Sequence, residues 1–330
     1  MTPAGQTMKI GQLPTPESLL VSPSCLPSSA VACGLAALLL ALGARAQAAP
    51  EALIGILQGP AVLVRQSTRF TLVEGAALGE GDIVETGKGA FAQLEFGDGA
   101  LVGLGEATRL IIRPRLVGLK AAAPPRLYLL DGWAKMRLPA KPGAAMDVLT
   151  PLFELDGRNA TAVVRQQPNA WAVFAESGAL RLQQRDGAKA GLNLNRGDFA
   201  APREGSDTAA ASPQLSPDFV QQLPRGFRDA LPARAELYAN KTITLQPLGL
   251  VSYEDVSAWL RTEPGIRLAL SRQWRGRASD KAFRAAAAAN LAAHMEWERV
   301  LFPERFLPKK PPAPGDGALR PAIAPASGNN

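Results

Sequence analysis

The chain has 330 residues, 47% of them hydrophobic and 6% aromatic, which is long enough for a sizeable core in two domains and excludes a wholly disordered protein. Its formal charge of +7 comes from 36 Lys and Arg against 29 Asp and Glu, spread along the chain without a block of like charges. A duplex-binding protein gathers its basic residues on one helix or stripe, so this distribution argues against nucleic-acid binding.

The N-terminal part predicts export. Residues 30–43, AVACGLAALLLALG, form an apolar run typical of a signal-peptide core and shorter than the roughly 20 residues that a spanning helix needs. The small residues that follow offer cleavage after Ala46 or Ala48. We therefore predict residues 1–48 as a leader and a mature chain in the periplasm or cell envelope. The alternative is an uncleaved leader, which anchors the protein in the inner membrane.

Residues 49–202 have the period-two pattern of short antiparallel strands, interrupted by glycines and Asp-Gly pairs. The stretch 89–104, GAFAQLEFGDGALVGL, shows the pattern best. Every second residue from Ala90 to Phe96 is apolar, which places the apolar set on one face of a sheet. Asp98-Gly99 follows as a tight hairpin turn, for which both residues are expected to take positive φ angles.

A weak internal repeat supports a sheet built from hairpins. The segments LQGPAVLVR, LDGWAKMRL and ESGALRLQQ each place a glycine (Gly59, Gly132 and Gly178) before an alternating strand. We predict a mainly β protein with a C-terminal α part: an antiparallel β sandwich, or a curled sheet of repeating hairpins, followed by a small helical domain.

The composition changes after the β region. Residues 203–215 are small and polar without a period, which predicts a linker. Residues 216–307 are predicted as the helical domain, beginning with an N-cap at Ser216 and Pro217 in the first turn. Residues 308–330 are rich in proline without apolar periodicity, which predicts a disordered tail.

Within the helical domain, Ser252 and Asp255 match a capping box that begins a second helix, and Pro264-Gly265 is predicted to end it. The longest helix is predicted over residues 279–301, which include five consecutive alanines. Its core stripe is predicted to consist of Phe283, Ala287, Leu291 and Met295.

The motifs of the β region carry a family resemblance. The segments GILQGPAVLVR at 55–65 and LGEGDIVETGKGAFAQLEFGDGALVGLGEATRLII at 78–112 resemble the periplasmic domain of FecR-type proteins, and the looser likeness extends over about residues 51–200. The positions that match the family's turns are Gly59, Gly81, Asp82, Thr86, Gly87, Asp98, Gly99 and Gly105.

The resemblance implies an exported β domain that binds and signals. Well-known FecR-type proteins also carry a cytoplasmic segment that regulates a sigma factor, and their outer part reads an iron-transport receptor. Here the stretch before the apolar run is short, rich in Pro and Ser and without a helical period, so no folded sigma-factor regulator is expected there. The family motif contains no catalytic residue, so none is carried over.

The residue types that perform catalysis or bind metals are scarce. Both cysteines, Cys25 and Cys33, lie in the leader, so no disulfide or thiolate metal site is expected in the mature chain. His294 is the only histidine, and neither a Gly-x-Ser-x-Gly elbow nor zinc or calcium spacing is present. Asn290, His294 and Glu298 would share one helix face as a polar site, but we favour a hydrogen-bonded structural histidine. We predict no enzyme activity, no cofactor and no metal.

A cluster of arginines around a tryptophan is the candidate partner-binding surface, because exposed Trp and Arg dominate binding hot spots. Its residues are Arg272, Trp274, Arg275 and Arg277. The alternative is that Trp274 packs in the core. The sequence supports the two interpretations of Trp274 equally. For Trp259 and Trp297, which lie on apolar stripes, core packing is the favoured prediction.

The sequence thus predicts a noncovalent binding or signalling module of the periplasm or cell envelope, with an envelope protein or a glycan as partner and without a signal for any oligomeric state. Three alternatives stay open. One is a membrane-anchored regulator that keeps its leader. Another is a glycan-acting enzyme, whose sign would be two carboxylates that converge in a cleft with perturbed titration. The last is a structural spacer, which predicts no cleft and no exposed aromatic patch.

Overall fold

The computed structural model describes residues 50–117, 125–139, 146–185, 191–202 and 209–307. The predicted leader and tail, and the first part of the predicted linker, lie outside these residues. No helix among the described residues is long and apolar enough to cross a membrane.

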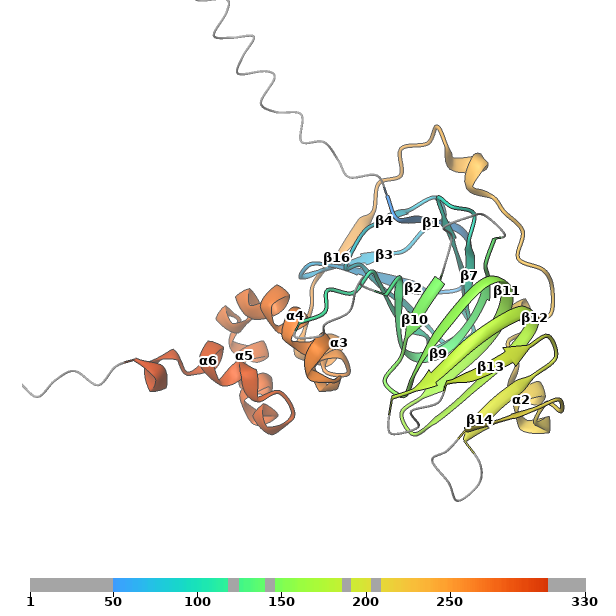
Figure 1. Ribbon diagram of the computed structural model, residues 1–330. Coiled ribbons are helices and arrows are strands. Elements are labelled where there is room, and N and C mark those ends of the chain that lie inside the picture. Colours follow the sequence, from blue (N-terminus) through green and yellow to red (C-terminus); the bar gives the residue numbers. More distant parts are fainter. Residues whose placement is uncertain (1–49, 118–124, 140–145, 186–190, 203–208, 308–330) are drawn as a thin grey trace, which may run out of the picture. The chain divides into compact units, whose positions relative to one another are not determined.

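The β region comes first along the chain, and most helices follow it (Figure 1). The strands are β1 (Ala52–Gln58), β2 (Ala61–Arg65), β3 (Thr68–Thr71), β4 (Ala77–Leu78), β5 (Ile83–Thr86), β6 (Phe91–Phe96), β7 (Leu101–Leu104), β8 (Arg109–Ile112), β9 (Leu127–Arg137), β10 (Met146–Leu149), β11 (Phe153–Gln167), β12 (Ala170–Gln184), β13 (Leu192–Asn195), β14 (Phe199–Pro202), β15 (Ala209–Ser212) and β16 (Gln246–Leu250).

Helices occupy the C-terminal part as short pieces. The α-helices are α2 (Pro217–Gln222), α3 (Tyr253–Val256), α4 (Pro264–Trp274), α5 (Lys281–Ala289) and α6 (Glu298–Leu301). Between them lie 3₁₀ turns at Arg225–Phe227, Ala235–Tyr238, Trp259–Arg261, Arg275–Ser279, Leu291–Ala293, Met295–Trp297 and Pro303–Phe306. The predicted fold class, mainly β with a C-terminal helical part, is confirmed.

The described strands form one large mixed sheet that is not closed into a barrel. Its main path runs β15-β14-β12-β11-β10-β9-β8-β5-β2-β3-β16, with β1, β4, β6, β7 and β13 attached beside it. The pairing of β9 with β10 is parallel, whereas other pairings, such as that of β6 with β7, are antiparallel. Of the two predicted architectures, this arrangement is closer to the curled sheet of hairpins than to two separate sheets.

Strand β9 bends and joins two parts of this sheet. Its first half pairs with β8 and β10, and its second half pairs with β7 and β11. Gly132 lies at the change of partner with φ of +103°, a conformation that residues with a Cβ avoid. A Cβ there would lie 2.3 Å from Thr108 Oγ1, so the two segments approach too closely for a side chain.

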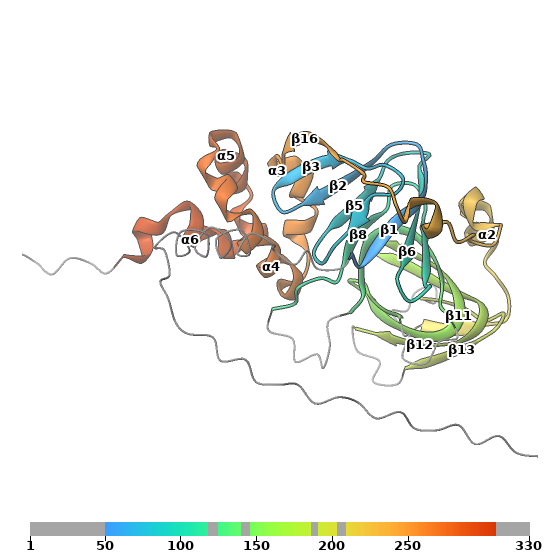
Figure 2. The ribbon, with the colours of Figure 1, turned by 90° about the horizontal axis from the view of Figure 1, so that it is seen from above.

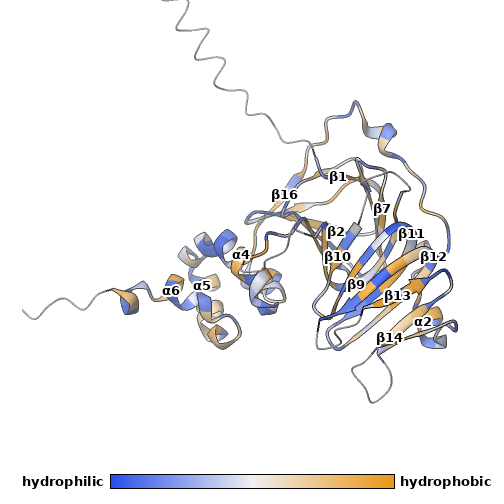
Figure 3. Cartoon of the chain, in the orientation of Figure 1, coloured by the Kyte–Doolittle hydropathy of each residue, from blue (hydrophilic) through white to orange (hydrophobic). Residues whose placement is uncertain are grey.

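The main core lies on one face of the curved sheet. Ala92, Leu94 and Phe96 of β6 all belong to it, so the predicted one-sided alternation is confirmed. Figure 3 shows both hydrophobic and hydrophilic stretches along β11 and β12. Faces turned away from this core are covered by two further apolar clusters.

One of these clusters joins the helical part to the sheet. Ile83 and Ile111 from β5 and β8 pack with Trp259, Trp274 and Trp297, all of which are fully buried. Figure 2 shows α4, α5 and α6 on this side of the strands. The predicted core packing of Trp259 and Trp297 is confirmed. The described residues from 50 to 307 belong to one compact unit, within which strands give way to helices.

The structure agrees with the predicted starts of helices more often than with their predicted ends. Pro217 begins α2, and Ser252 and Asp255 form the predicted capping box at α3. Pro264, however, begins α4 instead of ending a helix, because a proline is well suited to the first helical position. The predicted linker is wrong in its second part, since Ala209–Ser212 forms β15 and pairs with β14.

The predicted helix over residues 279–301 is also wrong. Helix α5 ends at Asn290, whose side-chain Nδ2 donates to the Ala286 carbonyl at 2.9 Å, and the chain continues in short turns to α6. Phe283 and Ala287 are buried as predicted, but Met295 is 69% exposed and lies outside the core. A side chain that folds back onto the helix end competes with helix continuation, which explains the break.

Candidate functional site

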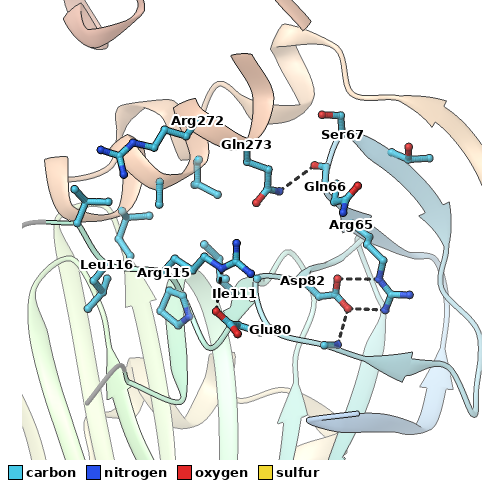
Figure 4. A pocket seen from close by; sticks show the side chains of 18 residues that line it. Arg65, Gln66, Ser67, Glu80, Asp82, Ile111, Arg115, Leu116, Arg272 and Gln273 are labelled. Atoms are coloured by element: carbon cyan, nitrogen blue, oxygen red, sulfur yellow. Dashed lines mark hydrogen bonds and ion pairs between the residues drawn. The ribbon is translucent and has the colours of Figure 1, made fainter. Parts of the chain in front are cut away.

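A cleft with a volume of about 830 Å³ lies where helix α4 meets the edge of the β region (Figure 4). Its wall is formed by the β2–β3 turn at Arg65–Thr68, the turn at Gly79–Asp82 before β5, the segment Ile111–Val117 after β8, and one face of α4. The polar residues that the argument below uses are Arg65, Gln66, Glu80, Asp82, Arg115 and Arg272.

Helix α4 fixes the β2–β3 turn that forms one wall. Gln66 has φ of +55°, which a residue with a Cβ adopts only under constraint. Its carbonyl accepts hydrogen bonds from Trp274 Nε1 at 2.7 Å and from Gln273 Nε2 at 3.0 Å. Because Trp274 is fully buried, its predicted place in an exposed cluster is corrected: the indole holds the turn from within the core.

The Gly81-Asp82 motif forms part of the cleft floor. The buried Asp82 carboxylate accepts from Arg65 Nε at 3.0 Å, from Arg65 Nη2 at 2.6 Å and from the Gly79 N–H at 2.7 Å. The hydrogen bond to Asp82 raises the pKa of Arg65 above its usual value, against the lowering effect of burial. This two-point contact holds Arg65 in place, so Asp82 organises this part of the cleft.

Two other arginines give the cleft its exposed positive charge. Arg272 of α4 is exposed and has no hydrogen-bond or ion-pair partner among the described residues. Arg115 pairs with Glu80 at 2.9 Å, but both side chains are more than half exposed, so solvent screens this pair. The cleft can therefore accept an anionic group without breaking a buried contact.

The other predicted arginines lie elsewhere. Arg277 donates from Nε to the Val251 carbonyl at 2.9 Å and so ties the 3₁₀ turn after α4 to the sheet side. Arg275 is exposed at the end of α4 and does not line the cleft. Of the four candidate partner-binding residues, the structure brings only Arg272 into the cleft. Arg65 and Arg115 have no local sequence signal and were not predicted.

The remaining turn residues serve the sheet. Gly59 has φ of +74° between β1 and β2. Thr86 Oγ1 donates to the Gly105 carbonyl at 2.6 Å, and the N–H of the next residue, Gly87, donates to the Pro60 carbonyl at 2.8 Å. These two contacts close the β5 end of the sheet. Gly59, Thr86, Gly87 and Gly105 contact no residue of the cleft. Their role is to form the turns and ends of the sheet.

The predicted hairpin at Asp98-Gly99 is present but differs in geometry. Of Asp98 and Gly99, only Gly99 has a positive φ, +90°, and four residues lie between β6 and β7, with the Gly99 N–H donating to the Phe96 carbonyl at 2.9 Å. Asp98 instead binds Arg126 at 2.6 Å and accepts from the Ala100 N–H at 3.1 Å. Its side chain thus stabilises the turn, and only the glycine needs the left-handed backbone.

His294 is a structural residue. It is fully buried, and its Nε2 lies 3.0 Å from the Tyr253 hydroxyl. Burial lowers the pKa of His294 below its usual value. The favoured prediction of a hydrogen-bonded structural histidine is confirmed, whereas a shared helix face with Asn290 and Glu298 is wrong because the helix ends before it.

A pair of carboxylates lies in a second, shallower concavity on the sheet. Asp147 of β10 and Asp156 of β11 are direct neighbours across the strands, beside Arg181 and Asn193. Burial, and then the hydrogen bond and negative charge of Asp147, raise the pKa of Asp156 to about 6. The two residues oppose each other directly in the antiparallel register of β10 and β11.

This pair makes stability depend on pH. The folded state holds the Asp156 proton more tightly than the unfolded chain, whose pKa is near 3.8, so the contribution is present below about pH 4 and lost as the pH rises to about 6. Because the side chain is partly exposed, we expect the unfolding free energy to fall by only about 1 kcal/mol across this range.

Urea unfolding of the wild type and of Asp156→Asn at intervals of pH checks this expectation. The wild type should lose stability relative to the variant between about pH 4 and pH 6. The substitution Asp147→Asn should flatten the same part of the profile, because it removes the neighbouring charge. Parallel profiles for all three proteins would show that the pair does not titrate in this range.

Comparison with known proteins adds little. No protein-family model and no curated protein matches this chain. Two crystal structures of a proposed anti-sigma factor from Parabacteroides distasonis are similar, with 15% and 14% sequence identity and a TM-score of 0.33 in both cases. Each match covers 39% of this chain and 58% of the other chain. A TM-score of 0.33 does not establish a shared fold.

Proposed function

We propose that this protein is a noncovalent binding and signalling module of the periplasm or cell envelope, and that its cleft beside α4 receives an acidic group of an envelope protein. The proposal is supported by the FecR-like set of turns in the β region and by the apolar run and small residues of the leader. The single observation that supports the binding site is that exposed Arg272, which has no partner among the residues that the structure describes, lines a cleft together with the Gly81-Asp82 turn.

The cleft suits recognition better than bond breaking. Asp82 is already occupied by Arg65 and the Gly79 N–H, so it has little capacity left to act as a general base. Arg272 and the solvent-exposed Arg115 present planar donors that match a carboxylate or another oxyanion. An acidic side chain of a partner could contact both guanidinium groups, and Glu80 would give up only a screened surface pair.

Charge reversal at the cleft is expected to reduce partner capture. We expect Arg272→Glu to lower the affinity for a partner identified by crosslinking from envelope extract by about tenfold or more, because a like charge then faces the acidic group. Arg275→Glu makes the same charge change on the same helix outside the cleft and serves as the matched control. The affinities are measured by titrating the purified partner at two salt concentrations, since screening weakens a true charge contact.

Equal losses for both variants would indicate a general charge effect, and unchanged binding of Arg272→Glu would contradict the cleft as the binding site. If the captured molecule is a glycan, protease treatment of the extract leaves capture intact, which would overturn the choice of a protein partner. The intact mass of the protein recovered from the envelope fraction shows whether the leader has been removed near Ala48 or retained as an anchor.

A further inference from the structure

Residues 224–238, termed here the strap, cross the outer face of strands β6, β7 and β9. They connect α2 to β16 and run along the outside of the sheet (Figure 1). The face beneath them is opposite the main core, because Leu94 and Met136 point into that core and their neighbours Gln93 and Lys135 point away from it. No residue of this face or of the strap lines the cleft described above.

Three buried polar side chains of this face hold the strap by its main chain. Lys135 Nζ donates to the carbonyls of Phe227 at 2.8 Å and Asp229 at 3.1 Å. Gln93 Nε2 donates to the carbonyl of Pro232, a residue of the same strap. Lys135 also forms an ion pair with Glu176 at 2.9 Å, outside the strap. The contacts to the strap go to its main-chain atoms, so they place no demand on the identity of the bound residues.

Glu95 completes the main-chain contacts. Its carboxylate accepts from the Arg234 N–H at 2.7 and 2.8 Å and from the Ala235 N–H at 2.9 Å. Gln93 Nε2 of the same strand also donates to Glu95 Oε1 at 3.2 Å, and Glu95 is only 4% exposed. Room for this carboxylate comes from Gly55 of β1, where a Cβ would lie 1.9 Å from Glu95 Oε1. Most of the hydrogen bonds of this buried carboxylate therefore come from the occupant of the face.

Two apolar side chains of the strap, Phe227 and Leu231, pack against the sheet face and are termed here the anchors. Gly103 of β7 lies beneath Leu231. Phe227 and Leu231 are buried, while Arg228, Pro232 and other strap residues between and after them are exposed. The Phe227 ring packs edge-on against Phe91 with centroids 6.2 Å apart. A Cβ at Gly103 would lie 3.2 Å from Leu231, so the small residue makes space for the anchor.

The strap does not satisfy every polar group of the groove. Gln93 Oε1 is fully buried and has no hydrogen-bond partner among the described residues. Most buried polar side chains in folded proteins do have a partner, and an unpaired acceptor is costly. The groove thus offers one more main-chain contact than its present occupant uses.

We propose that this face is a binding groove for a peptide segment with two apolar anchors, occupied within the chain by the strap, and that such a segment of a partner protein binds it by exchange. The segment is recognised by main-chain contacts to Lys135, Gln93 and Glu95 and by two apolar anchors spaced like Phe227 and Leu231. Exchange is possible because the strap itself is bound like a ligand, with few buried side chains and main-chain contacts that another sequence can reproduce.

A labelled peptide with the sequence of residues 222–238, QLPRGFRDALPARAELY, tests the groove in the full chain. The double substitution Phe227→Ser and Leu231→Ser weakens the strap and leaves the groove unaltered. We expect this variant to bind the peptide at least about tenfold more tightly than the wild type, because the competing segment within the chain no longer occupies the site. Adding Lys135→Met should abolish the gain. A peptide with both anchors changed to serine is the matched control.

Amide hydrogen exchange of the unaltered chain provides a second test that needs no substitution. The N–H groups of Arg234 and Ala235 should exchange by local opening, at least about tenfold faster than those of Leu94 in β6. Exchange as slow as that of Leu94 would overturn the proposal, because the strap would then leave only on global unfolding. A folded double variant that does not bind the peptide would overturn it as well.

Discussion

Replacing Gly132 with alanine is expected to destabilise the protein by about 3 to 5 kcal/mol, because a strained backbone and a steric overlap act together. Gly132 has φ of +103° at the bend of β9, and a Cβ there would overlap Thr108, whose Cα lies 2.4 Å from the Cβ position. Relief of this overlap requires β8 or β9 to move, and β9 joins the two parts of the sheet. The unfolding free energy in urea, with circular dichroism as the signal, measures the loss.

Gly276→Ala is the control for this substitution. Gly276 lies in an exposed 3₁₀ turn without a positive φ and without any atom near its Cβ position, so alanine should change stability by less than about 0.5 kcal/mol. A similarly small effect of Gly132→Ala would mean that the bend can relax, and the rigid junction at β9 would have to be abandoned.

Trp274→Ala is expected to cost about 3 to 5 kcal/mol, the range for removal of a large buried aromatic side chain. Trp274 is fully buried between α4 and the sheet, and its Nε1 donates to the Gln66 carbonyl at 2.7 Å. Trp274→Phe keeps most of the packing and loses this donor, so we expect it to cost only about 1 to 2 kcal/mol. The unfolding free energies of the two variants give the comparison.

Met295→Ala is the matched control, because Met295 belongs to the same helical part and is 69% exposed, so its removal should cost less than about 0.5 kcal/mol. If Trp274→Ala were as mild as this control, Trp274 would not be part of the core. A loss for Trp274→Phe as large as for Trp274→Ala would assign most of the energy to the hydrogen bond at the β2–β3 turn.

The candidate cleft was only partly predictable. The Gly81-Asp82 turn and Arg272 were both singled out from the sequence, but about 190 residues separate them, and nothing local indicates that they line one cavity. Arg65 carries no motif, and its role arises from the contact with Asp82 across the turn. The carboxylate pair has a weak signal, because Asp147 and Asp156 lie in two alternating segments joined by a short turn that brings them into register.

The sequence alone determined the period-two strands, the glycine turns and the helix starts, because these depend on backbone preferences and contacts within a few residues. It also placed Ala92, Leu94 and Phe96 on one face of β6, and the structure confirms that face as the main core.

Only the tertiary structure decided what covers the opposite face. Alternation predicts that Gln93 and Glu95 point away from the core, yet both are buried because the strap, nearly 140 residues further along the chain, lies over them. The same holds for Trp274, whose sequence surroundings are rich in arginine and whose burial comes from the sheet. Burial and pairing over such separations depend on packing of the whole chain, which local periodicity does not encode.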